Sequence, residues 1–324
     1  PNAAVKAVMA KQVAKAAVDK PDVVVLATGG TIAGRGASEV SANYQAAQIS
    51  GEALLGALPQ LSRLADVRAE QITNIASQDM SVAVWQKLAG RVRALLADND
   101  VAGLVITHGT DTLEETAFFL SLVIDSDKPV VLTASMRPSN GLSADGPMNL
   151  YNAVAVASAP QSRGRGVLVV ANDLIHPARA VTKTHTTRVD TFQSGLGGVL
   201  GTAQVGHVRY LRPASRLRAG NDFAAALDKP WPRVDILFGH AGFAADQVAS
   251  SVKQGAKGLV FAGVGNGNMN KATLAAVQKA IAQGVAVVRS SRVGHGNRAF
   301  CCSLRYFTIW IPPRYNRHLS GFNP

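Results

Sequence analysis

The sequence has few cysteines, few aromatic residues and, after Asp246, no acidic residues at all. Only two cysteines occur among its 324 residues, and they are neighbours, Cys301 and Cys302. A disulfide framework and a zinc-binding spacing are therefore excluded. Aromatic residues make up 6% of the chain and charged residues 17%, whereas 47% are hydrophobic. This hydrophobic share is enough to bury a substantial core, which excludes an intrinsically disordered chain.

Long apolar runs are also missing. No stretch approaches the roughly 18 consecutive apolar residues needed to cross a membrane, so we expect no membrane partner. The first twenty residues carry Lys6, Lys11, Lys15 and Lys20 without a compact apolar block. That is not the pattern of an intact signal peptide, and any leader would already have been removed. At roughly 150 residues per domain, the chain should form one large domain or two of unequal size.

Positive charge is concentrated near the end of the chain. The formal net charge is +12, from 33 Lys and Arg against 21 Asp and Glu. Ten of these basic residues lie between Lys253 and Arg317, where no acidic residue balances them. Aromatic residues interleaved with basic ones, as a nucleic-acid platform requires, occur only from Tyr306 to Trp310. We therefore expect no nucleic-acid partner.

Short apolar runs rich in β-branched residues recur along the chain, with helical stretches between them. Continuous Val, Ile and Leu runs without alternation are typical of strands buried on both faces of a parallel sheet. The alternation of elements predicts an α/β fold with right-handed crossovers. The expected strands cover residues 23–27, 101–107, 130–133, 166–170, 234–238, 258–262 and 285–288, and the expected helices residues 81–96, 112–124 and 149–157.

A change of pattern divides the chain in two. Polar residues and two prolines precede Arg233 and indicate a linker over residues 213–232. We expect a large N-terminal α/β domain with a mostly parallel sheet over residues 1–212, holding most of the active site. A smaller C-terminal α/β domain should cover residues 233–324. Just before the linker, the glycines and alternating residues of 195–211 indicate a hairpin.

Small, hydroxylated and amide side chains cluster directly after three of the predicted strands. These clusters cover residues 28–31, 108–112 and 263–268. Open α/β sheets place their ligands at the carboxyl ends of strands. Tight turns alone would explain the glycines but not the accompanying threonines and Asp111. The sequence therefore predicts a functional site where these strands end.

Three common chemistries are disfavoured at that site. Residues 28–34 form neither a Walker loop nor a G-x-G-x-x-G fingerprint, and no acidic residue follows residues 263–267 to hold a ribose. The seven histidines show no H-E-x-x-H or comparable metal spacing. No G-x-S-x-G elbow is present, which argues against the common serine hydrolases.

Two threonines at strand ends are the remaining candidates for chemistry. Thr31 stands beside glycines, and Thr110 stands beside Asp111. A threonine hydroxyl is a poor nucleophile at neutral pH and needs a base or a polarising neighbour. The candidates for that neighbour are Asp111, Lys183 and Tyr44.

Each of these neighbours also has a plainer interpretation. Lys183 can be a solvated surface lysine, and Asp111 can be the N-terminal cap of the predicted helix over residues 112–124. Tyr44 lies in the polar segment 33–48, whose glycines at positions 34 and 36 predict a mobile lid. The residues themselves leave these alternatives open.

Two of the segments above resemble the signatures of bacterial type II L-asparaginases. They are residues 26–34, LATGGTIAG, and residues 106–116, ITHGTDTLEET. The glutaminase-asparaginases belong to the same family. The similarity covers roughly residues 23–293 and continues through residues 76–80, 135–139, 143–146, 149–154, 181–184, 263–268 and 288–292.

The resemblance implies an amidohydrolase that converts L-asparagine to L-aspartate and ammonia, with some activity on L-glutamine. Thr31 would be the nucleophile that attacks the side-chain amide, with Tyr44 in the lid beside it. Thr110, Asp111 and Lys183 would form a second cluster, in which Lys183 helps Thr110 to accept or relay a proton. Members of the family need no metal and no organic cofactor.

Substrate-binding roles are implied in the same way. Asp111 would also hold the α-ammonium of the substrate, and Ser77 and Gln78 would bind its α-carboxylate and ammonium. Gln78 stands where many glutaminase-active members have Glu, which favours asparagine. Backbone N–H groups near Thr31 and Thr110 would stabilise the oxyanion, a contribution of about 3 kcal/mol per donor in other acyl-transfer enzymes.

The resemblance also implies an assembly and a compartment. The family builds each site between two subunits of a homotetramer, so Asn268 would reach into a neighbouring site, and it places such enzymes in the periplasm. The likeness ends near Val293: family members carry an acidic stretch there that supplies a glutamate to the neighbouring site, and residues 294–324 contain no acid. Two alternatives stay open, namely comparable use of both amides and a weakly active homologue that still binds an amino acid.

Overall fold

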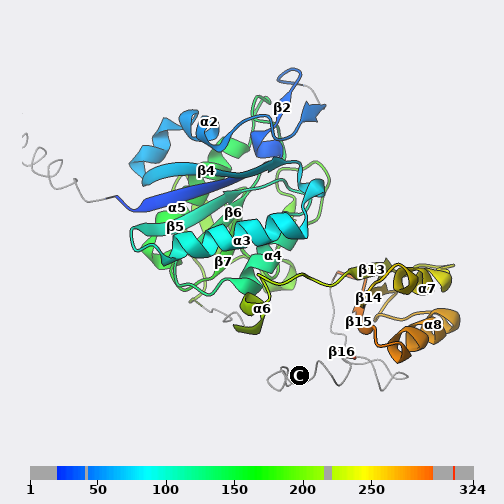
Figure 1. Ribbon diagram of the computed structural model, residues 1–324. Coiled ribbons are helices and arrows are strands. Elements are labelled where there is room, and N and C mark those ends of the chain that lie inside the picture. The colour runs from blue at the N-terminus through cyan, green and yellow to red at the C-terminus, as the bar shows by residue number, and fades with distance from the viewer. Residues whose placement is uncertain (1–19, 41–42, 215–220, 295–308, 311–324) are drawn as a thin grey trace, which may run out of the picture. The chain divides into compact units, whose positions relative to one another are not determined.

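The chain forms two compact units, Pro1–Asp228 and Lys229–Pro324 (Figure 1). The computed structural model describes residues 20–40, 43–214, 221–294 and 309–310. In this part of the chain no helix is long and apolar enough to cross a bilayer. Within the stretch that we expect to be a linker, α6 (Asn221–Ala225) is helical and Leu227 is buried. The limits 1–212, 213–232 and 233–324 stay a prediction.

The larger unit is built on an eight-stranded sheet with the order β12-β11-β8-β7-β6-β5-β1-β4. The pairings from β4 through β1, β5 and β6 to β7 are parallel, and the pairings from β7 to β12 are antiparallel. The mostly parallel sheet is therefore confirmed. Its strands are β1 (Asp22–Gly29), β4 (Asp66–Ile75), β5 (Val101–Thr107), β6 (Val130–Thr133), β7 (Val167–Ala171), β8 (Leu174–Pro177), β11 (Gly201–Gln204) and β12 (His207–Tyr210).

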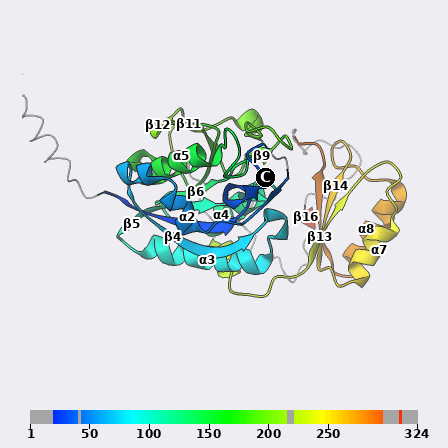
Figure 2. The same cartoon turned by 90° about the horizontal axis from the view of Figure 1, so that it is seen from above.

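Helices cover both faces of this sheet. α5 (Gly146–Ser158) and α3 (Val82–Ala97) lie on opposite sides of it (Figure 2). On the α5 side, Val23 and Val25 of β1 share one buried cluster with Leu150 and Val154 of that helix and with residues of α2 (Gly51–Gly56). On the other side, α3 packs against α4 (Leu113–Val123). Burial on both faces explains why these strands are continuous apolar runs.

Two strands of the larger sheet, β4 and β8, escape the sequence pattern. β4 is ten residues long and lies at the edge of the sheet beside β1. Most of its side chains are exposed or only partly covered, and Arg68, Glu70 and Gln71 break any apolar run. A search for continuous Val, Ile and Leu therefore misses it. The predicted hairpin is present as β11 and β12, joined at Val205 and Gly206, whose φ angles are 49° and 81°.

The smaller unit is a second α/β domain, in which helices pack on a sheet, as predicted. β13 (Val234–Phe238), β14 (Gly258–Gly263) and β15 (Ala286–Ser291) are parallel, and β16 (Ile309–Trp310) pairs antiparallel with β15. α7 (Asp246–Lys253) and α8 (Lys271–Ala282) lie on the same side of this sheet (Figure 2). Their apolar residues enclose a core around Leu259 and Phe261.

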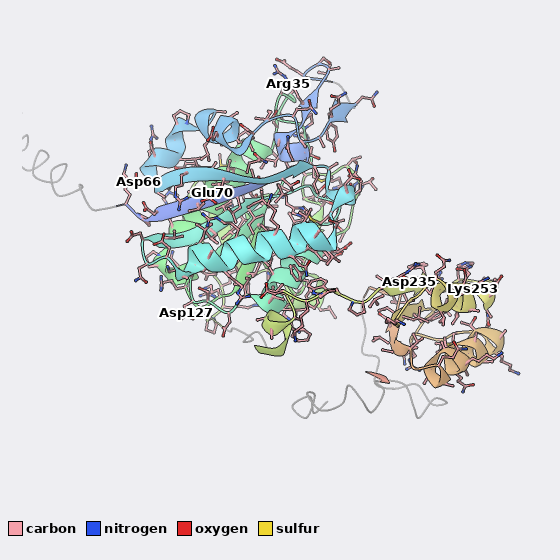
Figure 3. The ribbon with its side chains drawn as sticks, in the orientation of Figure 1. Arg35, Asp66, Glu70, Asp127, Asp235 and Lys253 are labelled. Carbon is pink, nitrogen blue, oxygen red and sulfur yellow. The ribbon has the colours of Figure 1, made fainter. Side chains whose placement is uncertain are left out.

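Two short hairpins stand apart from both sheets. One joins β2 (Arg35–Gly36) to β3 (Tyr44–Gln45) and belongs to the segment expected to be a lid, of which residues 41–42 lie outside the described residues. Arg35 marks this hairpin at the rim of the larger unit (Figure 3). The other joins β9 (Thr182–Lys183) to β10 (Phe192–Gln193). Each hairpin carries one of the side chains that the sequence singles out.

Candidate active site

Three neighbouring strands of the larger sheet end at the same edge. In the order β5-β1-β4, Thr110 follows β5, Thr31 follows β1 and Ser77 follows β4. All three side chains are buried, with Thr31 and Thr110 each 5% exposed and Ser77 4% exposed. Because the strands are parallel, segments that are far apart in the sequence converge at this edge. The missed strand β4 is the element that brings Ser77 there.

Glycines let these loops pack backbone against backbone. A Cβ atom on Gly30 would lie 2.3 Å from the amide nitrogen of Gly109, and a Cβ atom on Gly109 would lie 2.5 Å from Oγ of Ser77. Gly30 also has a φ of 78°, in the left-handed region that a side chain disfavours. Both positions therefore require glycine, and the loops carrying Thr31 and Thr110 are in direct contact.

Thr31 is paired with the tyrosine of the lid hairpin. Its Oγ1 lies 2.8 Å from Oη of Tyr44, and either hydroxyl can donate the hydrogen. Thr31 begins a short 3₁₀ turn, Thr31–Ala33, that is buried throughout, whereas Tyr44 is 43% exposed. A buried hydroxyl is thus covered by a phenol that belongs to a surface hairpin.

Thr110 is paired with a lysine instead. Nζ of Lys183 donates to Oγ1 of Thr110 at 2.9 Å and to Oδ1 of Asp111 at 2.6 Å. The Lys183 side chain is only 18% exposed, so the interpretation as a solvated surface lysine is wrong. The capping interpretation of Asp111 is also wrong, because Thr112 occupies the N-cap position of α4 and the Asp111 carboxylate turns to the lysine.

Ser77 connects the third loop to this second cluster. Its Oγ accepts the backbone N–H of Asp111 at 3.2 Å, and its carbonyl oxygen accepts the hydroxyl of Thr112 at 2.7 Å. The neighbouring Gln78 is exposed. The Asp111 side chain is 57% exposed, so one carboxylate stands at the opening of the site with Ser77 and Gln78 beside its loop.

Asn268 lies in the other compact unit. It closes the turn after β14, where its backbone N–H and carbonyl both bond to Val264. The structure thus brings together Thr31, Tyr44, Ser77, Thr110, Asp111 and Lys183 within the larger unit, whereas Asn268 belongs to the smaller one. The idea that Asn268 reaches a neighbouring site stays a prediction.

Two residues that support the site were missed by the sequence analysis. One is Glu114, whose carboxylate accepts the Thr182 hydroxyl at 3.0 Å and the backbone N–H of Lys183. The other is His108, a fully buried residue between the Thr116 hydroxyl, 2.9 Å away, and the Gly109 carbonyl, 2.8 Å away. Both stand in the segment 106–116, but their partners are visible only in three dimensions.

Burial and one hydrogen-bond partner together define the state of His108. The Gly109 carbonyl can only accept, so Nδ1 of His108 donates to it. Burial lowers the pKa of His108 to about 4, so the imidazole is neutral near pH 7 and its unprotonated Nε2 accepts from the Thr116 hydroxyl. Trp85 completes the chain by donating its Nε1–H to the Thr116 oxygen at 2.9 Å. This buried network holds the Gly109 peptide, which leads directly into Thr110.

Comparison with known proteins identifies the family to which this chain belongs. The family model described as Asparaginase, N-terminal matches residues 22–216, and the model described as Glutaminase/Asparaginase C-terminal domain matches residues 233–300. The chain therefore belongs to the asparaginase family.

Individual relatives agree with the family models. A Haemophilus influenzae protein named "Probable L-asparaginase periplasmic" is 47% identical over 281 residues, which are 86% of this chain and 80% of the relative. A "Glutaminase-asparaginase" of Pseudomonas fluorescens biotype A is 45% identical over 85% of this chain and 76% of its own length. The crystal structure of a "Probable Cytoplasmic L-asparaginase" from Campylobacter jejuni superposes with a TM-score of 0.80 at 41% identity, covering 85% of this chain and 84% of that one.

Proposed function

We propose that this protein hydrolyses the side-chain amide of L-asparagine to give L-aspartate and ammonia. The observation that carries the proposal is the ammonium of Lys183, which bonds the hydroxyl of Thr110 and the carboxylate of Asp111 beside the loop of Thr31. Membership of a family whose relatives are named asparaginases and glutaminase-asparaginases supports it.

In the first half of the reaction, Oγ1 of Thr31 attacks the amide carbon of the substrate. The hydroxyl of Tyr44 is the nearest group that can exchange a proton with this oxygen. Backbone N–H groups near Thr31 and Thr110 stabilise the negative oxygen of the tetrahedral intermediate. The C–N bond then breaks, the nitrogen takes up a proton and leaves as ammonia, and an ester joins the substrate to Thr31.

In the second half, water attacks the ester. The hydroxyl of Thr110 takes a proton from that water as its own proton passes to the departing Oγ1 of Thr31. The ammonium of Lys183, held in place by Asp111, donates to Oγ1 of Thr110 and orients it for this relay. The ester C–O bond breaks, the Thr31 hydroxyl is restored and L-aspartate leaves. All of these groups belong to the protein, so the reaction as proposed needs no metal and no organic cofactor.

Recognition of the amino-acid end of the substrate falls to the exposed side of the site. The Asp111 carboxylate is accessible to the α-ammonium, and Ser77 and Gln78 on the neighbouring loop are placed to bind the α-carboxylate and ammonium. We place Asn268 of an adjacent subunit at the same site, in a homotetramer whose subunits share their sites. Sedimentation of the purified protein tests this assembly.

A second question is how well the protein hydrolyses L-glutamine compared with L-asparagine. Asparagine and glutamine differ by one methylene, which is worth only about 1–3 kcal/mol of discrimination in a pocket. We propose a preference for asparagine because of Gln78, with comparable use of both amides as the alternative. One relative is named a glutaminase-asparaginase, which keeps that alternative open.

The compartment is a proposal as well. We assign the protein to the periplasm, on the likeness to the relative named periplasmic. The similar crystal structure carries the name cytoplasmic, so fractionation of cells that express the natural gene is the deciding measurement.

Ammonia release tests the activity directly. The purified chain should release ammonia from L-asparagine faster than from L-glutamine, and Thr31→Ala should release none from either. A chain that binds L-aspartate in calorimetry without hydrolysing L-asparagine would instead be the weakly active amino-acid-binding homologue.

A further inference from the structure

We propose that Glu114 is a positioning residue for the reaction, because it fixes the backbone of Lys183 and thereby places the lysine ammonium between Thr110 and Asp111. This inference rests on the proposed function, in which Lys183 helps Thr110 to relay a proton. It starts from the carboxylate of Glu114, whose two oxygens accept the hydroxyl of Thr182 at 3.0 Å and the backbone N–H of Lys183.

The strand that carries Lys183 lies outside the main sheet. Among the described residues, β9 contains two residues and pairs with β10 in a two-stranded sheet. Buried Thr191 and Phe192 anchor the other arm of this hairpin, whereas both residues of β9 are only partly buried. The Glu114 carboxylate fixes β9 to the segment of Thr110, since it stands on the first turn of α4 and binds two consecutive residues of β9.

Glu114 and the two groups at the lysine ammonium belong to one short segment. Thr110 and Asp111 hold Nζ of Lys183, and Glu114, three residues after Asp111, holds its backbone nitrogen. A lysine side chain has four rotatable bonds, so attachment at one end alone would leave its ammonium free to move. Attachment at both ends to residues 110–114 restricts the ammonium to the position between the hydroxyl and the carboxylate.

The contact favours a carboxylate over an amide. Both partners, a backbone N–H and a hydroxyl, donate hydrogen to Glu114, and a carboxylate can accept at both oxygens. In Glu114→Gln the amide oxygen still accepts the Lys183 N–H, but the N–H₂ group must donate to a Thr182 hydroxyl that has turned, and the negative charge is lost. Glu114→Ala removes both contacts. The position at the first turn of a helix also favours negative charge.

Substitution of Glu114 should therefore lower kcat while KM stays within about threefold, because Asp111, Ser77 and Gln78 are not altered. We expect kcat to fall severalfold in Glu114→Gln, which keeps uncharged forms of both contacts, and about a hundredfold in Glu114→Ala, the size of loss that a misplaced catalytic group causes. Glu115→Gln is the matched control, an exposed carboxyl on the same turn, and should change kcat by less than twofold.

Thr182 offers a second pair of variants should a substitution at 114 prevent folding. Thr182→Val removes the hydroxyl that donates to Glu114 and keeps the side-chain shape, so kcat should fall severalfold. Thr182→Ser keeps the hydroxyl and should restore kcat to within twofold of the wild type. A purely steric role for Thr182 would reverse this order.

The decisive experiment combines Glu114→Ala with Lys183→Met. If Glu114 acts through the lysine, Glu114→Ala causes no further loss of kcat once the ammonium is gone, which is the non-additivity expected of coupled residues. A loss in the double variant that equals the product of the two single losses, or an unchanged kcat in Glu114→Ala alone, overturns the inference and leaves the proposed function standing. An unchanged kcat in Lys183→Met overturns the role of Lys183 in the proposed function, and this inference with it.

Discussion

Thr31 and Thr110 occupy equivalent places in the fold but have different partners. Both follow parallel strands that are neighbours in the sheet, and both are 5% exposed. Thr31 faces the hydroxyl of a tyrosine on a surface hairpin, whereas Thr110 faces the ammonium of a lysine whose backbone N–H is also bonded. One threonine thus lies under a surface hairpin, and the other belongs to a charged network. We infer that the sheet supplies two hydroxyl positions and that the attached hairpins give them different tasks.

The strongest test of this difference is removal of the Thr31 hydroxyl. Thr31→Ala should lower kcat by about 10⁴-fold or more, the loss that follows removal of a nucleophile in other hydrolases. Ammonia release gives kcat, and mass spectrometry of the wild-type protein quenched during turnover should find an acyl group on the peptide that contains Thr31.

A third buried threonine at a strand end serves as the control. Thr133, the last residue of β6, donates its hydroxyl to the carbonyl of Val170 and has no part in the proposed chemistry. Thr133→Val should cost about 1 kcal/mol of unfolding free energy and leave kcat within twofold. More than a tenth of wild-type turnover in Thr31→Ala would mean that another residue is the nucleophile.

The second test removes the charged partner of Thr110. Lys183→Met removes the ammonium shared by Thr110 and Asp111 and leaves the Thr31–Tyr44 pair in place. We expect kcat to fall about 10³-fold, within the range of general acid–base contributions. Arg188→Met, in the same hairpin and paired on the surface with Asp190, should keep full activity. Equal losses in the two variants would point to damage of the hairpin rather than to the ammonium.

The sequence predicts the strand ends of the site far better than it predicts their partners. β1 and β5 are continuous apolar runs followed by glycine and threonine, so their position and the two threonines can be recognised locally. β4 could not be recognised locally, because an edge strand is partly exposed to solvent and this one keeps the polar residues Arg68 and Glu70. Yet β4 is what delivers Ser77.

The partners of Lys183 lie 69 to 73 positions away from it along the chain, and no local sequence pattern encodes contacts of that separation. The same holds for Glu114, which in the sequence is indistinguishable from any acidic residue that favours the start of a helix. Sequence similarity to a family supplied the roles of Lys183 and Asp111 where spacing alone left two plain alternatives. Three-dimensional contacts were needed to reject those alternatives.

A third test uses acid to weaken the buried network beside Thr110. Burial lowers the pKa of His108 to about 4, below the 6.5 of an ordinary histidine. The unfolded chain therefore binds this proton first, so the stabilisation is complete above pH 6.5 and is lost as the pH falls from 6.5 towards 4. At about 1.4 kcal/mol per unit of pKa difference, the loss in unfolding free energy should reach about 3 kcal/mol near pH 4.

Denaturant unfolding across this pH range measures the effect. His108→Asn keeps a donor for the Gly109 carbonyl and removes the titration, so the pH dependence of its stability should be flatter than that of the wild type. His207, exposed on β12, is the control, and His207→Asn should keep the wild-type slope. His176, whose pKa burial also lowers to about 4, will leave part of the slope in every variant.

The smallest expected effect concerns the phenol over Thr31. Tyr44→Phe removes a single hydroxyl, 2.8 Å from Oγ1 of Thr31, and keeps the ring that covers it. One hydrogen bond of this kind is worth about 1 kcal/mol, so kcat should fall only about fivefold, far less than in Lys183→Met. A loss as large as that in Lys183→Met would show that the two threonine clusters are equally dependent on their partners.

Hydrogen exchange tests whether this weaker dependence comes with movement of the lid hairpin. Gly34 and Gly36 flank Arg35 in β2, and we expect the amides of residues 33–40 and 43–48 to exchange slowly only when L-aspartate is bound. Amides of β9 and β10, tied to α4 through Glu114, should show the same protection with and without L-aspartate. If the two hairpins respond alike, the division into a covering hairpin and a fixed one is wrong. If only the lid hairpin responds, the small loss of kcat in Tyr44→Phe has a direct explanation. The Tyr44 hydroxyl then bonds Thr31 only while the lid is closed, so its contribution to kcat scales with the fraction of time that the lid spends closed.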